Sequence, residues 1–314
     1  MLLPILGIIA GLVVLTYAAD QFVVGAARVA TSLRLSTVVV GAVVIGFGTS
    51  APELLVSGLA GASGAIDLAI GNIVGSNVAN LTLVLGVAAL IAPIVVRSPV
   101  LKREAPISLV AVLVFAWAIQ GSLSIIDGIV LTIVLVAALT FIILSARGGD
   151  PGLTSEVEEF LSDTPPALRR EAVRTGLGLL GTLGAAQVLV VSATAIAESL
   201  GLSQGFIGLT VVAIGTSLPE LATAVQAARK GETDLIIGNL LGSNLFNAGA
   251  VGAVAAFAGA GLPIDRTIST LGVGLMVGIA VIATLFMVTG KRVVRWEAIV
   301  LLIAYAATLP LLAG

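Results

Sequence analysis

The amino-acid sequence predicts an all-α, polytopic membrane protein with ten transmembrane helices, arranged as two inverted five-helix repeats. Three observations support this prediction. Hydrophobic residues make up 58% of the 314-residue chain and charged residues 10%, which leaves too few polar side chains to cover a soluble globule. The segment GFGTSAPELL at 46–55 returns as AIGTSLPELA at 213–222. The Lys and Arg residues also fall on alternate loops between apolar stretches.

The apolar stretches set the expected helices. About 20 apolar residues are needed to cross a bilayer, and on that basis we expect spans near 2–28, 36–60, 68–92, 104–121, 124–146, 171–197, 203–228, 234–258, 267–289 and 293–313. The first stretch lacks a basic leader segment and a small-residue cleavage site, so we expect it to be retained as a helix.

The basic residues orient the predicted chain in the membrane. With the N-terminus outside, the inside loops hold all but Arg266 of the 15 Lys and Arg residues. Cytoplasmic loops are enriched in these residues, so the pattern predicts a multi-pass protein of the cell membrane with both termini outside. The chain has no Cys and no His, which excludes disulfides, thiolate metal sites, catalytic triads that need His, and histidine-based pH sensing.

The repeat divides the chain. An offset of 167 residues carries Glu53 to Glu220, and the same offset aligns GNIVGSNVAN at 71–80 with GNLLGSNLFN at 238–247. Each half has an odd number of predicted spans, so the second half must enter the membrane in the opposite orientation. We therefore expect an N-terminal repeat at 1–148, a cytoplasmic connecting loop at 149–169 and an inverted repeat at 170–314. Inverted repeats around a central site suit alternating access.

Glu53 and Glu220 are the strongest candidate site residues. A carboxylate inside a membrane span costs several kcal/mol unless it faces a polar cavity or a cation, so such a residue is functional by default. A purely structural ion pair is disfavoured, because no basic residue lies in the core of any predicted span. Two such glutamates in matching positions predict one shared cation site.

The flanking residues predict interrupted helices. Pro52 and Pro219 have no backbone N–H for the carbonyl four residues earlier, so carbonyl groups are released beside the two glutamates. Gly46, Gly48 and Gly215 lower the cost of local unwinding. Neighbouring hydroxyls come from Thr49, Ser50, Thr216 and Ser217. Such irregular backbone survives at membrane depth only where it lines a cavity.

The second repeated block supplies the opposing wall. Ser76 and Asn80 are four residues apart, as are Ser243 and Asn247, so each pair shares one helix face. These side chains could also serve only as hydrogen bonds between helices. Together with the carboxylates they form an all-oxygen ligand set, which suits hard cations such as Ca²⁺ and Na⁺. We expect spans 2, 3, 7 and 8 to carry the interruptions.

The other acidic residues have simpler interpretations. Asp67, Asp234 and Asp127 stand at span beginnings, where helix N-capping is the expected role. Asp20 has no acidic repeat mate, which favours a peripheral polar residue over a gating contact. The connecting loop contains a Ser155 to Glu158 capping box, so a short solvated helix is favoured there over a regulatory Ca²⁺ site.

The motifs resemble the α-repeats of the cation/calcium exchanger superfamily, and most closely those of microbial sodium/calcium exchangers. GTSxPEL and GNxxGSNxxN occur in both halves, and the ten-span plan covers the whole chain. The resemblance implies that Glu53 and Glu220 bind Ca²⁺ together with backbone oxygens of Thr49 and Thr216.

The resemblance also implies Na⁺ positions that overlap the Ca²⁺ site and share Glu53 and Glu220. One would use the backbone of Gly46 with Thr49 and Ser76. Its symmetry mate would use the backbone of Ala213 with Thr216 and Ser243, and Ser50 and Ser217 match nearby positions. Asn80 and Asn247 would lie at the central site. Some microbial members have Asp at the position of Asn247, so here the site charge is expected to stop at −2.

The implied function is a secondary active antiporter that exchanges Na⁺ for Ca²⁺ by alternating access. A Ca²⁺/H⁺ exchanger using the same carboxylates stays open as an alternative. A passive cation channel is disfavoured by the inverted symmetry and the lack of acidic rings. An intramembrane hydrolase is disfavoured because neither HExxH nor GxGD occurs. We expect no enzymatic activity, no cofactor and no nucleic-acid partner; the partners are the transported ions and the bilayer, and the sequence carries no indication of an oligomeric state.

Overall fold

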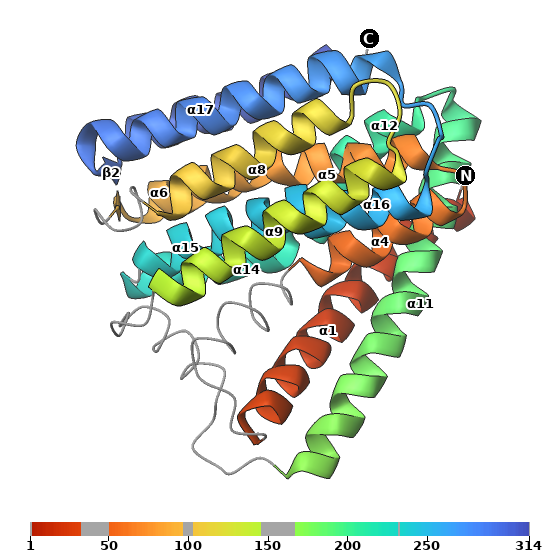
Figure 1. Ribbon diagram of the computed structural model, residues 1–314, viewed down its shortest axis with the longest axis horizontal. Coiled ribbons are helices and arrows are strands. Elements are labelled where there is room, and N and C mark those ends of the chain that lie inside the picture. The colour runs from red at the N-terminus through yellow and green to blue at the C-terminus, as the bar shows by residue number, and fades with distance from the viewer. Residues whose placement is uncertain (1, 33–49, 97–102, 146–166, 232, 314) are drawn as a thin grey trace.

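The computed structural model describes residues 2–32, 50–96, 103–145, 167–231 and 233–313, and nearly all of these residues are helical (Figure 1). The first half contains α1 (Leu2–Ser32), α4 (Ala51–Ala62), α5 (Ile66–Ala79), the π-helical turn η2 (Asn80–Val84), α6 (Leu85–Ile91), α8 (Glu104–Ala118) and α9 (Ile125–Ser145). Helices therefore occupy the described part of every stretch predicted as a span in this half. The second predicted span is described only from residue 50 onward.

The second half follows the same order. It contains α11 (Leu168–Leu200), α12 (Gln204–Ile207), η4 (Gly208–Val212), α13 (Ala213–Thr216), α14 (Leu218–Lys230), α15 (Thr233–Phe246), η5 (Asn247–Val251), α16 (Gly252–Ala258), η6 (Ile268–Gly272), α17 (Val273–Gly290) and α18 (Arg295–Ala313). The break predicted in span 7 lies at Ser217, between α13 and α14. Spans 3 and 8 are continuous helices that each contain one π-helical turn, so no break is seen where their interruptions were predicted. Span 9 carries a π-helical turn that was not predicted.

Six helices among the described residues are long and apolar enough to cross a membrane. A seventh is reached when Gln204–Thr216 and Leu218–Arg229, bent by 41° at their junction, are counted as one broken span. α8 is apolar but shorter. The protein is thus a mainly helical membrane protein, and the count of ten spans stays a prediction.

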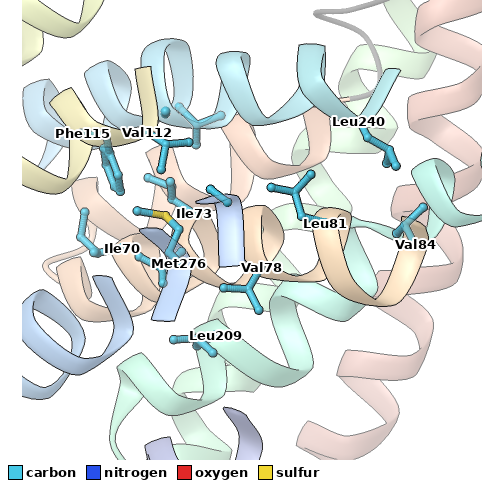
Figure 2. Close-up of a cluster of buried hydrophobic side chains, with 14 of the residues drawn as sticks. Ile70, Ile73, Val78, Leu81, Val84, Val112, Phe115, Leu209, Leu240 and Met276 are labelled. Carbon is cyan, nitrogen blue, oxygen red and sulfur yellow. The ribbon is translucent and has the colours of Figure 1, made fainter. Parts of the chain in front are cut away.

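α5 lies at the centre of the bundle, where nearly all of its side chains are buried. Figure 2 shows Ile70 and Ile73 of α5 facing Val112 and Phe115 of α8 and Met276 of α17. On another side, glycine permits backbone contact with η4, because a Cβ atom at Gly75 would lie 2.3 Å from the carbonyl oxygen of Leu209. The central helix of the first half therefore packs directly against the broken helix of the second half.

α1 and α11 form a long pair along one edge of the bundle (Figure 1). Small residues permit their close contact: a Cβ at Gly178 of α11 would lie 2.5 Å from the backbone nitrogen of Phe22 in α1. Near the end of α1, the guanidinium of Arg28 lies 3.2 Å from the carboxylate of Glu171, which is also 3.7 Å from Arg174. Glu171 is thereby neutralised at its buried position.

Two short β pairings join the halves. β1 (Ile94–Val95) pairs antiparallel with β2 (Arg292–Val293). A second pairing joins Ser122 to Pro263 through an isolated bridge, with Gly261 N–H donating to the Leu123 carbonyl at 2.8 Å. Each pairing links the segment after the third predicted span of one half to the segment before the fifth predicted span of the other. The same connection is thus made twice with the halves exchanged.

Candidate cation-binding site

Glu53 and Glu220 occupy equivalent places at the beginnings of two helices. Glu53 lies in the first turn of α4 and Glu220 in the first turn of α14, each next to a proline at the start of its helix. Proline is favoured there because its missing N–H is not needed. Both glutamate side chains are completely buried. The positive end of each helix dipole favours a negative charge at this position.

The carboxylates of Glu53 and Glu220 belong to one buried polar region, which we call the centre. Ser217, three residues before Glu220, donates to Glu53 Oε1 at 3.5 Å, so the carboxylate of one repeat lies against the break of the other. Ser243 donates to Glu220 Oε1 at 3.4 Å. The Oε2 atoms of Glu53 and Glu220 are buried and have no hydrogen-bond partner, which leaves two oxygens available to a cation.

The break beside Glu220 is the one predicted from Pro219. α13 ends at Thr216, α14 begins at Leu218, and Ser217 between them has a φ of −86° and a ψ of 6°. Pro219 cannot donate to the carbonyl of Gly215, so that carbonyl loses its helical partner. In the first repeat Gly46, together with Gly48 and Thr49, the equivalents of Gly215 and Thr216, lies outside the described residues, while Ser50 is buried and its hydroxyl has no partner.

Hydroxyl groups of both repeats meet on the opposing wall. Ser76 Oγ of α5 lies 3.4 Å from Thr216 Oγ1, and both side chains are fully buried. Thr216 Oγ1 also donates to Asn72 Oδ1 at 3.1 Å and contacts the carbonyl of Ala213 at 3.3 Å. A hydroxyl whose hydrogen is held by another group keeps a lone pair free for a cation.

Asn80 and Asn247 stand at the first residues of the π-helical turns η2 and η5. Both are completely buried. Asn80 Nδ2 donates to Asn244 Oδ1 at 3.1 Å, whereas Asn80 Oδ1 and both polar atoms of Asn247 have no partner. Single π-helical turns inside α-helices are common at functional sites. The arrangement adds neutral amide oxygens to the same buried polar region.

Three asparagines at this centre were not singled out in the sequence. Asn72 Nδ2 donates to Ser57 Oγ at 3.0 Å and to the Glu53 carbonyl at 3.4 Å, so it ties α5 to α4 while holding Thr216. Asn77 and Asn244 are also almost completely buried. The available signal was their place inside the repeated GNxxGSNxxN block, where they recur at the 167-residue offset.

Three acidic residues outside the centre can be compared with their expected roles. The capping role expected for Asp67 is wrong: α5 begins after Ala65 without a side-chain cap, and Asp67 Oδ1 instead accepts from the Asp265 N–H at 2.8 Å. Asp127 is not the N-cap of α9 either: Ser124 is, since its Oγ accepts from the Asp127 N–H at 3.2 Å, and Asp127 reaches back as the capping-box partner by accepting from the Ser124 N–H at 2.8 Å. Asp20 is exposed and accepts from Gln21, as a peripheral residue would.

The side chain of Asp234 and the connecting segment that contains Ser155 and Glu158 lie outside the described residues.

The centre fits a hard cation. Among the described residues, no Lys or Arg forms an ion pair with Glu53 or Glu220, so their charges are left for a mobile ion. Every side-chain ligand candidate offers oxygen, and two carboxylates can balance one divalent ion. Because the ligand candidates come from both halves, a relative movement of those halves would change the site directly.

Comparisons with known proteins agree with this chemistry. The family described as "Sodium/calcium exchanger protein" matches residues 3–144 and 172–313. The sodium/calcium exchanger MaX1 of Methanosarcina acetivorans is 30% identical over 349 residues, covering 96% of each chain. The inner membrane protein YrbG of Escherichia coli K12 is 39% identical over 251 residues, covering 79% of this chain and 77% of YrbG.

Solved structures give the same result. The sodium-calcium exchanger NCX_Mj, soaked with Na⁺ and Sr²⁺, aligns with a TM-score of 0.67 and 32% sequence identity, covering 98% of each chain.

Proposed function

The chain belongs to the sodium/calcium exchanger protein family, and from that premise we propose that it is a secondary active antiporter that exchanges Na⁺ for Ca²⁺ by alternating access. The observation that carries the proposal is the pair of buried glutamates. Glu53 and Glu220 come from opposite halves, lie in the first turns of α4 and α14, and each keep one unpartnered oxygen without a basic neighbour in the described chain.

The proposed ligands follow from this centre. Ca²⁺ would be held by Glu53 and Glu220, with backbone oxygens of Thr49 and Thr216 completing the shell. Na⁺ would use the two glutamates with the hydroxyls and carbonyls beside them, which are Gly46, Thr49, Ser50, Ser76, Ala213, Thr216, Ser217 and Ser243. The amides of Asn80 and Asn247 would line the centre between them. The contact between Ser76 and Thr216 supports a position built from both halves.

The proposed architecture has ten spans in two inverted five-helix halves, with an N-terminal repeat at 1–148, a connecting loop at 149–169 and a C-terminal repeat at 170–314. Three regularities support it. The π-helical turns begin at Asn80 and Asn247, which differ by the repeat offset. The two β pairings connect equivalent segments with the halves exchanged. The family match also falls into two stretches of similar length.

The proposed orientation places both termini outside, because nearly all Lys and Arg residues then lie on inside loops. In the structure, the first helix begins and the last helix ends toward the same side of the bundle (Figure 1). That arrangement supports an even number of spans.

The test is a flux measurement in proteoliposomes. Vesicles loaded with Na⁺ should take up radioactive Ca²⁺ from a Na⁺-free medium, and the uptake should vanish when the internal Na⁺ is replaced by choline or the Na⁺ gradient is collapsed by an ionophore. A pH gradient without Na⁺ should drive no uptake. Uptake driven by the pH gradient alone would replace the proposal with Ca²⁺/H⁺ exchange, and uptake without any gradient of a second ion would indicate a channel.

A further inference from the structure

Four asparagines form a compact repeated set at the centre. The repeat offset relates Asn77 to Asn244 and Asn80 to Asn247. All four side chains are at most 1% exposed. In each half, one of the two asparagines opens a π-helical turn, and the other precedes it by three residues on the same helix.

One half of this set is hydrogen-bonded across the halves. Asn80 Nδ2 donates to Asn244 Oδ1 at 3.1 Å, and Asn244 Nδ2 donates to the carbonyl oxygen of Asn77 at 3.4 Å. These bonds fix which way the Asn80 amide faces. Its Oδ1 atom is therefore held in one direction, buried and without a protein partner, as a ligand oxygen would be.

The hydrogen bonds that would result from exchanging the two halves are absent from this set of four asparagines. The repeat relation would have Asn247 Nδ2 donate to Asn77 Oδ1, yet both atoms are buried without a partner. Asn77 Nδ2 donates instead to the Ile73 carbonyl of its own helix at 2.8 Å. The two halves contain the same residues at these positions, so the asymmetry belongs to the conformation and not to the sequence.

Buried amide groups without partners are destabilising, so a second conformation that pairs them is favoured to that extent. We propose that Asn77 and Asn244 are positioning residues that act in alternate states of the exchanger. Asn244 orients the Asn80 amide in the state described above, and Asn77 orients the Asn247 amide in the opposite state. The inference rests on the proposed exchange by alternating access.

The proposed alternation determines which amide oxygen faces the bound ion. Each state presents one oriented amide oxygen to the centre, from Asn80 in one state and from Asn247 in the other. Each state would form one of the two hydrogen bonds, Asn80 to Asn244 or Asn247 to Asn77, and lose the other. The two end states would therefore be similar in energy. A transporter needs such near-equality to pass between its states without being trapped in one.

The experiment compares Asn77→Ala with Asn244→Ala. The half-saturating Ca²⁺ concentration for Na⁺-driven exchange is measured on each face of the membrane, using right-side-out and everted vesicles from the same cells. Each substitution removes the hydrogen bond between asparagine side chains in one state only, so the ratio of the two half-saturating concentrations should shift in opposite directions, by about fivefold for one hydrogen bond. The double variant should return the ratio close to that of the wild type.

Thr82→Val is the matched control, because Thr82 is buried in the same π-helical turn and its hydroxyl bonds only to the Val78 carbonyl of its own helix. Its ratio should stay unchanged. If the alanine variants do not fold, Asn77→Ser and Asn244→Ser, which are too short to reach the partner amide, replace them in the same assay.

Two outcomes overturn the account in different ways. Wild-type vesicles without Na⁺-driven exchange contradict the proposed function and, with it, this inference. Wild-type exchange combined with ratios that stay fixed, or that move in the same direction in both variants, overturns the positioning role alone.

Discussion

At the scale of single residues, the two buried glutamates pose the main physical problem of the molecule. A carboxylate at membrane depth costs several kcal/mol when it is left without compensation. Here the compensation is partial, because each glutamate has a helix N-terminus and one weak hydroxyl hydrogen bond but no basic partner in the described chain. The remaining charge is what a transported cation would neutralise.

Replacing either glutamate by glutamine should therefore nearly abolish Ca²⁺ exchange. Glu53→Gln or Glu220→Gln removes half of the negative charge facing the ion, and loss of one partner of a buried charge pair costs about 3–5 kcal/mol, or more than about a hundredfold in affinity. Na⁺-driven Ca²⁺ uptake measures the effect. Glu297→Gln is the matched control, since Glu297 is buried at the start of α18 and only accepts from the Val294 N–H. Wild-type uptake in either site variant would contradict the assignment.

The hydroxyl of Ser76 should matter more for Na⁺ than for Ca²⁺. Ser76→Ala removes a neutral oxygen beside Thr216 and leaves both carboxylates in place. We expect the Na⁺ concentration for half-maximal exchange to rise about fivefold, with a smaller change for Ca²⁺. Titration of each ion against initial exchange rates tests this, with Ser108→Ala in α8 as a buried control. Equal losses for both ions would show that Ser76 is not a Na⁺ ligand.

The site could be predicted from sequence wherever chemistry and repetition coincided. Two glutamates in apolar runs are conspicuous, and the hydroxyls beside Glu220 lie where the motif places them. Asn72, Asn77 and Asn244 could not be separated from helix-packing amides, because their roles depend on side chains from other helices. The capping role predicted for Asp67 is wrong because its carboxylate accepts a hydrogen bond from the backbone N–H of Asp265 instead.

At the scale of elements, the broken helix α12 to α14 places Ser217 and Glu220 at the centre. The break was predictable because proline removes a defined hydrogen bond. The π-helical turns at Asn80 and Asn247 were not, since neither contains a proline, and π-helical turns are single-turn features set by packing. The two turns begin at these two buried amides.

Restoring the missing donor should slow exchange. Pro219→Ala provides an N–H for the Gly215 carbonyl and favours a continuous helix, so we expect a drop of about tenfold in the exchange rate without loss of thermal stability. Initial rates and unfolding temperatures measure both quantities. Pro310→Ala, which makes the same change inside α18, should leave the rate unaltered. A Pro219→Ala variant with wild-type rates would mean that the break does not serve transport.

At the scale of the whole molecule, composition was enough to predict a helical membrane protein and the positions of its described helices, whereas the ten-span inverted plan stays a prediction. Composition and repetition could not predict that α1 and α11 pack together at one edge, nor that short β pairings would join the halves twice (Figure 1). Those contacts join residues far apart in the chain, and the loop residues that pair carry no distinctive local pattern.

The charge of the whole site predicts a dependence on voltage. Glu53 and Glu220 balance one Ca²⁺, whereas about three Na⁺ ions in the same centre would leave roughly one net positive charge. An inside-negative potential should then accelerate Na⁺ entry coupled to Ca²⁺ exit, because one charge gains about 2.3 kcal/mol per 100 mV. Potentials imposed with valinomycin and K⁺ test this. Unchanged flux would indicate electroneutral exchange and a smaller Na⁺ load.

The central claim is that Glu53 and Glu220 hold one Ca²⁺ that Na⁺ displaces, and equilibrium dialysis of purified protein with radioactive Ca²⁺ tests it most directly. The account predicts about one bound Ca²⁺ per chain, lost cooperatively as Na⁺ rises and absent in Glu53→Gln and Glu220→Gln. Binding that ignores Na⁺, or that survives in both glutamine variants, would contradict it.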